Sequence, residues 1–105
     1  MITTDDFKKV EMKAGKIISA ETIEGSEKLL KLSVDFNEEN PRQVISGIAK
    51  YISLQDLVGT TCAFVTNLEP REIMGLESQV MIMASSDENS FSLLKMDCPP
   101  GSIVK

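Results

Sequence analysis

A strict alternation of apolar and polar side chains is the feature that most constrains how this chain can fold. From residue 30 to residue 36 every even position is apolar and every odd position is polar; the apolar positions are Leu30, Leu32, Val34 and Phe36. A period of two residues is that of a strand with one buried face. The same period runs from residue 9 to residue 22 and breaks once, after Gly15. We expect a bulge or sharp bend at Gly15 that turns Lys16 outward and returns Ile17 to the interior.

The rest of the chain indicates further short strands and two helical turns. Residues 43–46 and 91–94 are strand-like, and residues 60–66 and 80–84 are apolar on both faces, which is typical of central strands covered on two sides. Capping residues predict a helical turn at residues 3–7 and a short helix after Ser53 that ends at Gly59. Five or six strands with a small helix after the third predict an all-β fold with short helices, the oligonucleotide-binding (OB) barrel.

Length and hydropathy indicate a single domain. The 105 residues, of which 42% are hydrophobic, suffice for one core and are too few for two, so one domain over residues 1–105 is expected. The chain contains no apolar run long enough to span a bilayer and lacks a basic-then-apolar signal at its N-terminus. We therefore expect a cytoplasmic protein with no membrane partner.

The residue types present argue against catalysis. There is no His, so the commonest general base is missing, and two Cys cannot complete a tetrahedral zinc site. Cys62 sits in an apolar run and Cys98 before a proline pair, so both are expected to be free thiols. The adjacent Glu38 and Glu39 are better interpreted as a hairpin loop than as an acid/base pair. We expect no enzyme activity, no metal and no cofactor.

Charge alone does not settle whether a polyanion binds. The net charge of −5 argues against a nucleic acid, but six of the eleven basic residues fall between positions 8 and 31, so one surface could be locally positive. Ordinary solvated strands would produce the same pattern.

The run from Asn67 to Met81 interrupts two apolar segments with a polar, turn-rich stretch, which we interpret as a binding loop. Asn67 and Ser78 supply neutral hydrogen-bonding groups and Arg71 a fixed charge, while Pro70 and Gly75 constrain the backbone.

Together with residues 11–17 and 42–51, this run resembles the tRNA-binding domain found at the C-terminus of many methionyl-tRNA synthetases and in free-standing tRNA-binding proteins. The resemblance extends from about Phe7 to the end of the chain. This sequence departs from the family pattern in having Lys13 where Arg is usual and Val80 where Gly is usual, and in keeping only the acid-Lys-Leu end of the turn at residues 23–29.

The resemblance implies a non-catalytic domain that grips the backbone and shape of tRNA. The nucleic-acid-binding residues it implies are Lys13, Lys16, Lys28, Asn67, Arg71, Ser78 and Met81. The lysines and Arg71 would contact phosphates, Asn67 and Ser78 a base edge or ribose, and Met81 the face of a base. Alternatively, Lys13 and Lys28 are ordinary surface residues and Met81 fills the core. Lys50 and Tyr51 could also reach a ligand, although a Tyr near a helix start is more often a packed ring with an exposed hydroxyl.

Homodimerisation is implied as well, through Phe7, Pro99, Pro100 and Ile103, because the apolar end of the C-terminal segment lacks an obvious partner within the chain. A synthetase catalytic region is a further possible partner, and a free-standing protein and an excised synthetase domain are indistinguishable by sequence. Relatives with the same barrel act as secretion-related chaperones that bind peptide, which is the alternative function.

Overall fold

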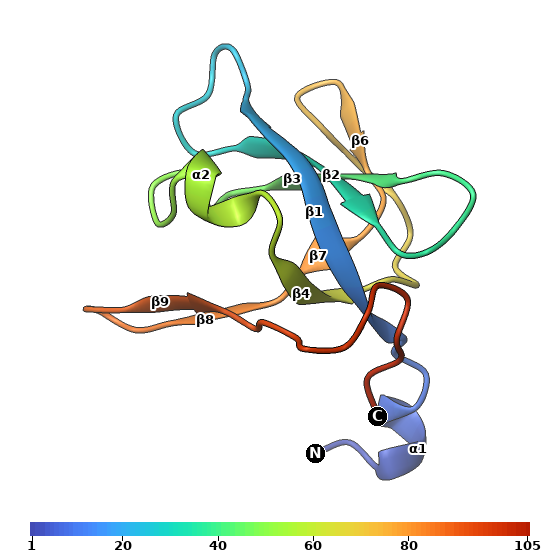
Figure 1. The fold of residues 1–105 in the computed structure, drawn as a ribbon. Helices are drawn as coiled ribbons and strands as arrows, with labels where there is room; N and C mark the ends of the chain where they lie inside the picture. Colours follow the sequence, from blue (N-terminus) through green and yellow to red (C-terminus); the bar gives the residue numbers. More distant parts are fainter.

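The first strand organises the fold, because both of its edges are paired. In the computed structural model, which describes residues 1–105, β1 (Met12–Thr22) pairs antiparallel with β2 (Leu30–Asp35) on one edge and with β4 (Thr61–Val65) on the other. With β3 (Arg42–Ser46) and β7 (Met81–Ile82) these strands form a five-stranded sheet in the order β3-β2-β1-β4-β7 (Figure 1). Before its pairing with β2 begins at Lys16, β1 pairs on that edge with the C-terminal segment, where the Val104 N–H donates to Met12 O (2.9 Å).

The sheet curls so that its two edge strands approach each other. The Gln79 N–H donates to the carbonyl of Gln43 in β3 (2.9 Å), and the Gln43 N–H donates to the side-chain oxygen of Gln79 (2.8 Å). These bonds join the chain just before β7 to β3, and a nearly closed barrel results. The predicted all-β fold of the oligonucleotide-binding type is confirmed.

Two hairpins project from this barrel. The first consists of β5 (Arg71–Ile73) and β6 (Leu76–Ser78), and the second of β8 (Ala84–Ser86) and β9 (Phe91–Leu93). The stretch that was expected to be a loop is thus largely a hairpin. Its turn is Met74-Gly75, both with positive φ (52° and 78°), as a two-residue type I′ turn requires.

Both predicted helical turns are present. The first, α1 (Thr4–Phe7), begins with a capping box between Thr3 and Asp6, and the second, α2 (Leu54–Leu57), is capped by the Ser53 side chain. Neither helix has the length and apolar character needed to cross a bilayer.

The core is built from the inward faces of the barrel strands. A cluster of 13 buried residues contains every apolar position of the alternating segment, from Leu30 to Phe36, and Phe64 packs edge-on against Phe36 with ring centroids 5.3 Å apart. All residues of β4 after Thr61 are buried, as predicted for a doubly covered strand. The same prediction for residues 80–84 is wrong, because β7 is an edge strand in which Met81 is exposed. Cys62 belongs to the core and Cys98 is exposed, and both thiols are free as expected.

The break in the alternation of β1 lies at a different place from the one expected. Lys16 is exposed and Ile17 is buried, as predicted, but the register of the β1–β2 pairing shifts between Ile17 and Ser19, not at Gly15. Gly15 stays in register opposite Cys62. Its role is to leave room, because a Cβ at this position would lie 2.6 Å from the Phe36 ring and 2.6 Å from a Val34 methyl.

This close packing predicts the effect of adding one methyl group. We expect Gly15→Ala to lower the free energy of unfolding by about 1–3 kcal/mol, because two buried core side chains must move. Gly47→Ala is the matched control, since a Cβ there meets no atom within 4 Å. Urea unfolding of both variants measures the difference, and equal stabilities would contradict the packing role of Gly15.

Candidate functional site

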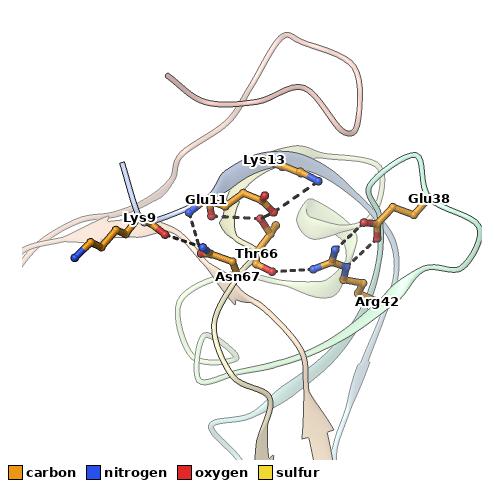
Figure 2. A network of polar contacts seen from close by, with 7 residues as sticks. All are labelled: Lys9, Glu11, Lys13, Glu38, Arg42, Thr66 and Asn67. Atoms are coloured by element: carbon orange, nitrogen blue, oxygen red, sulfur yellow. Dashed lines mark hydrogen bonds and ion pairs between the residues drawn. The ribbon is translucent and has the colours of Figure 1, made fainter. Parts of the chain in front are cut away.

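A network of charged and polar groups closes one end of the barrel and contains Lys13 (Figure 2). The Lys13 ammonium lies 3.6 Å from Oε1 of Glu11, and the Thr66 hydroxyl donates to the same oxygen (2.6 Å). Beside them, Arg42 donates two hydrogen bonds to the carboxylate of Glu38 (2.8 and 2.6 Å) and a third to the Thr66 carbonyl (2.9 Å). The Arg42 guanidinium also lies over the Phe36 ring, 5.4 Å from its centroid.

The network neutralises its own charges. The hydrogen bond from Thr66, followed by the nearby charge of Lys13, holds the pKa of Glu11 below its usual value. Hydrogen bonds from Arg42 do the same for the pKa of Glu38, and the same contact raises the pKa of Arg42. The Lys13 side chain, only 22% exposed, therefore faces carboxylates. It is poorly placed to be a free phosphate contact.

Asn67 holds the chain together at this end of the barrel. Its side-chain oxygen accepts the Glu11 N–H (2.8 Å), and its amide nitrogen donates to the Lys9 carbonyl (2.7 Å). Both polar atoms thus anchor the segment before β1 to the segment after β4. The predicted contact of Asn67 with a ligand is not needed to explain its position, and it stays a prediction.

Lys16 points away from this network. Residues 13 and 16 differ in parity along β1, so their side chains project from opposite faces of the strand. Lys16 is exposed on the outside of the barrel, where its cross-strand neighbours are Asp35 in β2 and Thr61 in β4. The structure therefore does not bring Lys13 and Lys16 together on one face of β1.

Three other predicted residues do meet, at the seam between β3, β7 and the β5–β6 hairpin. Arg71, Ser78 and Met81 line a pocket of about 90 Å³ together with mainly apolar neighbours, which are Ile45, Ser46, Leu68, Glu69, Ile73, Val80 and Ile82. Met81 is 48% exposed, so it does not simply fill the core. Arg71 is exposed and has no carboxylate within salt-bridge distance.

Ser78 and Val80 are two buried residues of this pocket that follow the hairpin turn. The buried Ser78 hydroxyl accepts the Ile45 N–H (3.0 Å) and lies within hydrogen-bonding distance of the Val80 carbonyl (3.3 Å). Ser78 thereby ties the hairpin to β3, and a direct contact with a ligand stays untested. Val80 is a buried member of the core cluster and has no positive φ, so its side chain is accommodated where the family usually has glycine.

The loop that contains Lys28 approaches the same hairpin at another of its residues, Gly25. The loop between β1 and β2 touches the hairpin tip, because a Cβ on Gly25 would lie 3.7 Å from the Met74 methyl. The carbonyl of Lys28 accepts the Ala49 N–H (3.1 Å), and this bond joins the β1–β2 loop to the chain after β3. The next residue of that chain is the exposed Lys50. Neither lysine is within 4.0 Å of a carboxylate.

The ion pairs separate the cations into two groups. Lys9, Lys13, Lys31 and Arg42 are paired with carboxylates. The unpaired cations are Lys8, Lys16, Lys28, Lys50, Arg71, Lys95 and Lys105. We use the name loop–hairpin surface for the exposed parts of three adjoining segments, the β1–β2 loop with Lys28, the chain after β3 with Lys50 and the β5–β6 hairpin with Arg71. No three His, Cys, Asp or Glu side chains are grouped so that they could hold a metal ion.

Sequence reasoning gave too little weight to Tyr51. The residue is 62% exposed, and its ring stacks on Phe91 of the β8–β9 hairpin, with centroids 5.0 Å apart and planes 14° from parallel. Only its position next to Lys50 signalled a functional role, and the ring on which it rests comes from a segment 40 residues away in the sequence.

Comparisons with known proteins agree with this geometry. A family model described as "Putative tRNA binding domain" matches residues 12–102. A methionine–tRNA ligase of Methanocella arvoryzae is 46% identical over an alignment of 106 positions that covers 99% of this chain and 15% of the ligase. The chain thus spans about 15% of the length of that curated relative.

Two solved structures are similar over their whole length. The MetRS related protein from Pyrococcus horikoshii superposes with a TM-score of 0.92 at 37% identity, with 100% of this chain and 98% of that chain covered. The chaperone CsaA from Bacillus anthracis superposes with a TM-score of 0.88 at 26% identity, with 100% and 99% covered.

The barrel-end network predicts a dependence of stability on pH. Because the folded-state pKa of Glu11 is lowered, its stabilising effect is complete above the ordinary pKa of glutamate and is lost as the pH falls through the folded-state value. Thr66→Val removes the largest cause of this shift. We expect it to reduce the free energy of unfolding by only about 0.5–1.5 kcal/mol at neutral pH, because the Glu11 side chain is 42% exposed and solvent screens its charge, and to flatten the loss of stability in acid.

Urea unfolding over a pH series measures both effects. Thr22→Val, an exposed site whose hydroxyl makes no hydrogen bond in the structure, is the control. An acid limb that is as steep in Thr66→Val as in the unsubstituted protein would contradict the role given to this hydrogen bond.

Proposed function

This chain belongs to the tRNA-binding domain family, and we propose that it is a non-catalytic domain that binds tRNA through its loop–hairpin surface. The observation that carries the proposal is the exposure of three unpaired cations, Lys28, Lys50 and Arg71, on adjoining loops of a fold shared along the whole chain with a MetRS related protein.

Unpaired cations matter because the net charge is negative. Phosphate binding draws its free energy from released counterions, so a cation that is already neutralised by a carboxylate contributes little. Lys13 and Arg42 are neutralised in this way, whereas Arg71 and Lys28 are not. Arg71 presents a planar fork that can hold a phosphate in two places, and Met81 beside it offers a polarizable surface to a base or ribose.

Lys16 defines a second region on the outside of β1. The sheet order places β1 midway between the edge strands β3 and β7, so Lys16 lies across the barrel from the seam that carries Arg71. A Lys16 contact would require the RNA to reach around the barrel, and Lys16→Glu tests this separately.

The proposed domain acts beside a catalytic region that this chain does not contain. Its methionine–tRNA ligase relative is more than six times as long, with 15% of that protein covered, and these residues include no His for acid–base chemistry. We propose that residues 1–105 form one domain that holds tRNA in the cytoplasm, either for a synthetase or as a free-standing protein.

A peptide-binding chaperone is the weaker alternative. The CsaA structure supports it at 26% identity, against 46% for the ligase, and the apolar lining of the seam pocket would suit a peptide side chain. Titration of the protein with tRNA and with an unfolded polypeptide separates the two functions, because the chaperone alternative requires the polypeptide to bind.

Charge reversal on the loop–hairpin surface tests tRNA binding. We expect Arg71→Glu and Lys28→Glu each to weaken the affinity for bulk tRNA about 3- to 30-fold at low salt and to reduce the salt slope by about 1. Lys105→Glu is the control, because it changes the net charge equally at the exposed last residue. Absence of measurable tRNA binding by the unsubstituted protein at low salt would defeat the proposed function.

A homodimer is the second part of the proposal. The termini lie close together in Figure 1, and their exposed apolar residues include Phe7 (49% exposed) and Ile103 (63%), next to the Pro99-Pro100 turn. The C-terminal segment is not without a partner, since its backbone pairs with β1, but this pairing leaves the Ile103 side chain uncovered. Two such surfaces facing each other would double the cations available to one RNA.

The dimer is tested by placing charges in the proposed contact. We expect Phe7→Glu with Ile103→Asp to convert a dimer into a monomer in sedimentation equilibrium, because each change buries an unpaired carboxylate. Val58→Asp, at an exposed apolar residue next to α2, is the matched control. A monomeric unsubstituted protein at high concentration would contradict this part of the proposal.

A further inference from the structure

The Tyr51 ring packs on Phe91 with one face, and its other face is open to solvent. Its backbone N–H donates to the carbonyl of the buried Ile48 (3.0 Å), and its ring lies nearly parallel to Phe91. Phe91 is in turn partly buried against the hydrophobic core. The Phe91 ring can cover only one face of Tyr51, and with 62% of the residue exposed, the other face is available.

Two lysines without an ion pair belong to the segments around this open ring. Lys50 is the preceding residue, and Lys28 is joined to the same loop through the hydrogen bond from Ala49 (3.1 Å). Neither lysine lies within 4.0 Å of a carboxylate, although Glu27, Asp56 and Glu88 belong to the adjoining segments. Asp56 is already engaged, because it accepts the Ser53 hydroxyl (3.0 Å).

We propose that Tyr51 is a stacking site for one unpaired base of a bound RNA, with Lys50 and Lys28 as the phosphate contacts on either side of that nucleotide. This inference rests on the proposed function and deepens it by assigning a base-binding position. An anchored aromatic ring with unpaired cations beside it has the two properties that recognition of single-stranded RNA requires, a π-face and local positive charge.

The structure also limits what this site does. Phe7 is the other exposed ring, but it lies in α1 beside the chain termini, so the Tyr51 site takes one base and not a run of bases. No hydrogen-bonding group of the ring faces its open side, since the Tyr hydroxyl lies in the ring plane. The site therefore accepts any base and adds affinity for loops and ends of RNA without selecting their sequence.

Substitutions of Tyr51 test stacking directly. Base–aromatic stacking corresponds to about 5- to 150-fold in affinity, so Tyr51→Ala should weaken tRNA binding by a factor in this range, whereas Tyr51→Phe should stay close to the unsubstituted protein. Tyr51→Leu keeps an apolar side chain without a π-face and should behave like Tyr51→Ala. Full affinity in either the Ala or the Leu variant would overturn the inference.

The variants outside the stacking site distinguish a failure of this inference from a failure of the proposed tRNA-binding function. If Tyr51→Ala binds tRNA normally while Arg71→Glu does not, the stacking site is wrong and the tRNA-binding function stands. If the unsubstituted protein does not bind tRNA at all, both fail. Thermal unfolding of each Tyr51 variant confirms that the fold is retained. Lys50→Ala should lower the salt slope of tRNA binding by about 1, because it removes one phosphate contact and leaves the Tyr51 ring in place.

The composition provides a direct optical probe. Tyr51 is the single Tyr and there is no Trp, so the intrinsic fluorescence of the protein comes from this ring, and Tyr51→Trp introduces a single Trp at the same place. We expect a single-stranded oligoribonucleotide to quench this Trp much more strongly than a blunt duplex of the same sequence, because only the terminal pairs of the duplex expose the face of a base. Equal quenching by both RNAs, no quenching by either, or quenching by an unfolded polypeptide instead would overturn the assignment.

Discussion

The close approach of three strands around Gly15 is the constraint on which the rest of the structure depends. With no side chain at this position, β1 can lie against the Phe36 ring and the Val34 methyl while pairing with β4 on its other edge. This places β1 in the middle of the sheet and sets which of its residues face inward. Lys13 and Lys16 then project from opposite faces, so one lysine joins a neutralised network and the other stays free.

The same arrangement explains how a chain of net charge −5 can present cationic surfaces. Several cations are paired within the barrel-end network or on neighbouring strands, while Lys28, Lys50 and Arg71 remain unpaired on the loops and the hairpin. Exposed charges act on a ligand only over a short distance, because the Debye length at physiological salt is about 8 Å. Local pairing of charges therefore matters more for a polyanion than their sum.

Local sequence patterns predicted the strands well. The alternation of residues 30–36 led to β2, the capping residues led to both helical turns, and the doubly apolar run led to the buried β4. The β5–β6 hairpin was mistaken for a loop because its turn requires a positive φ at Met74, which is unusual for a residue other than Gly, Asn or Asp. The bulge of β1 was misplaced, because a glycine that leaves room for a ring looks the same in sequence as one that bends a strand.

By itself, the sequence determined the fold class, the family and the residue types available for binding, since these follow from periodicity and from motifs that are contiguous along the chain. Only the tertiary structure decided which polar groups are still available to a ligand. Asn67 and Ser78 are engaged with backbone atoms of Lys9, Glu11 and Ile45, and Tyr51 is supported by Phe91. These contacts join residues that are 33 to 58 positions apart in the chain. Such pairings arise when the barrel closes, and they leave no periodic signal in the sequence.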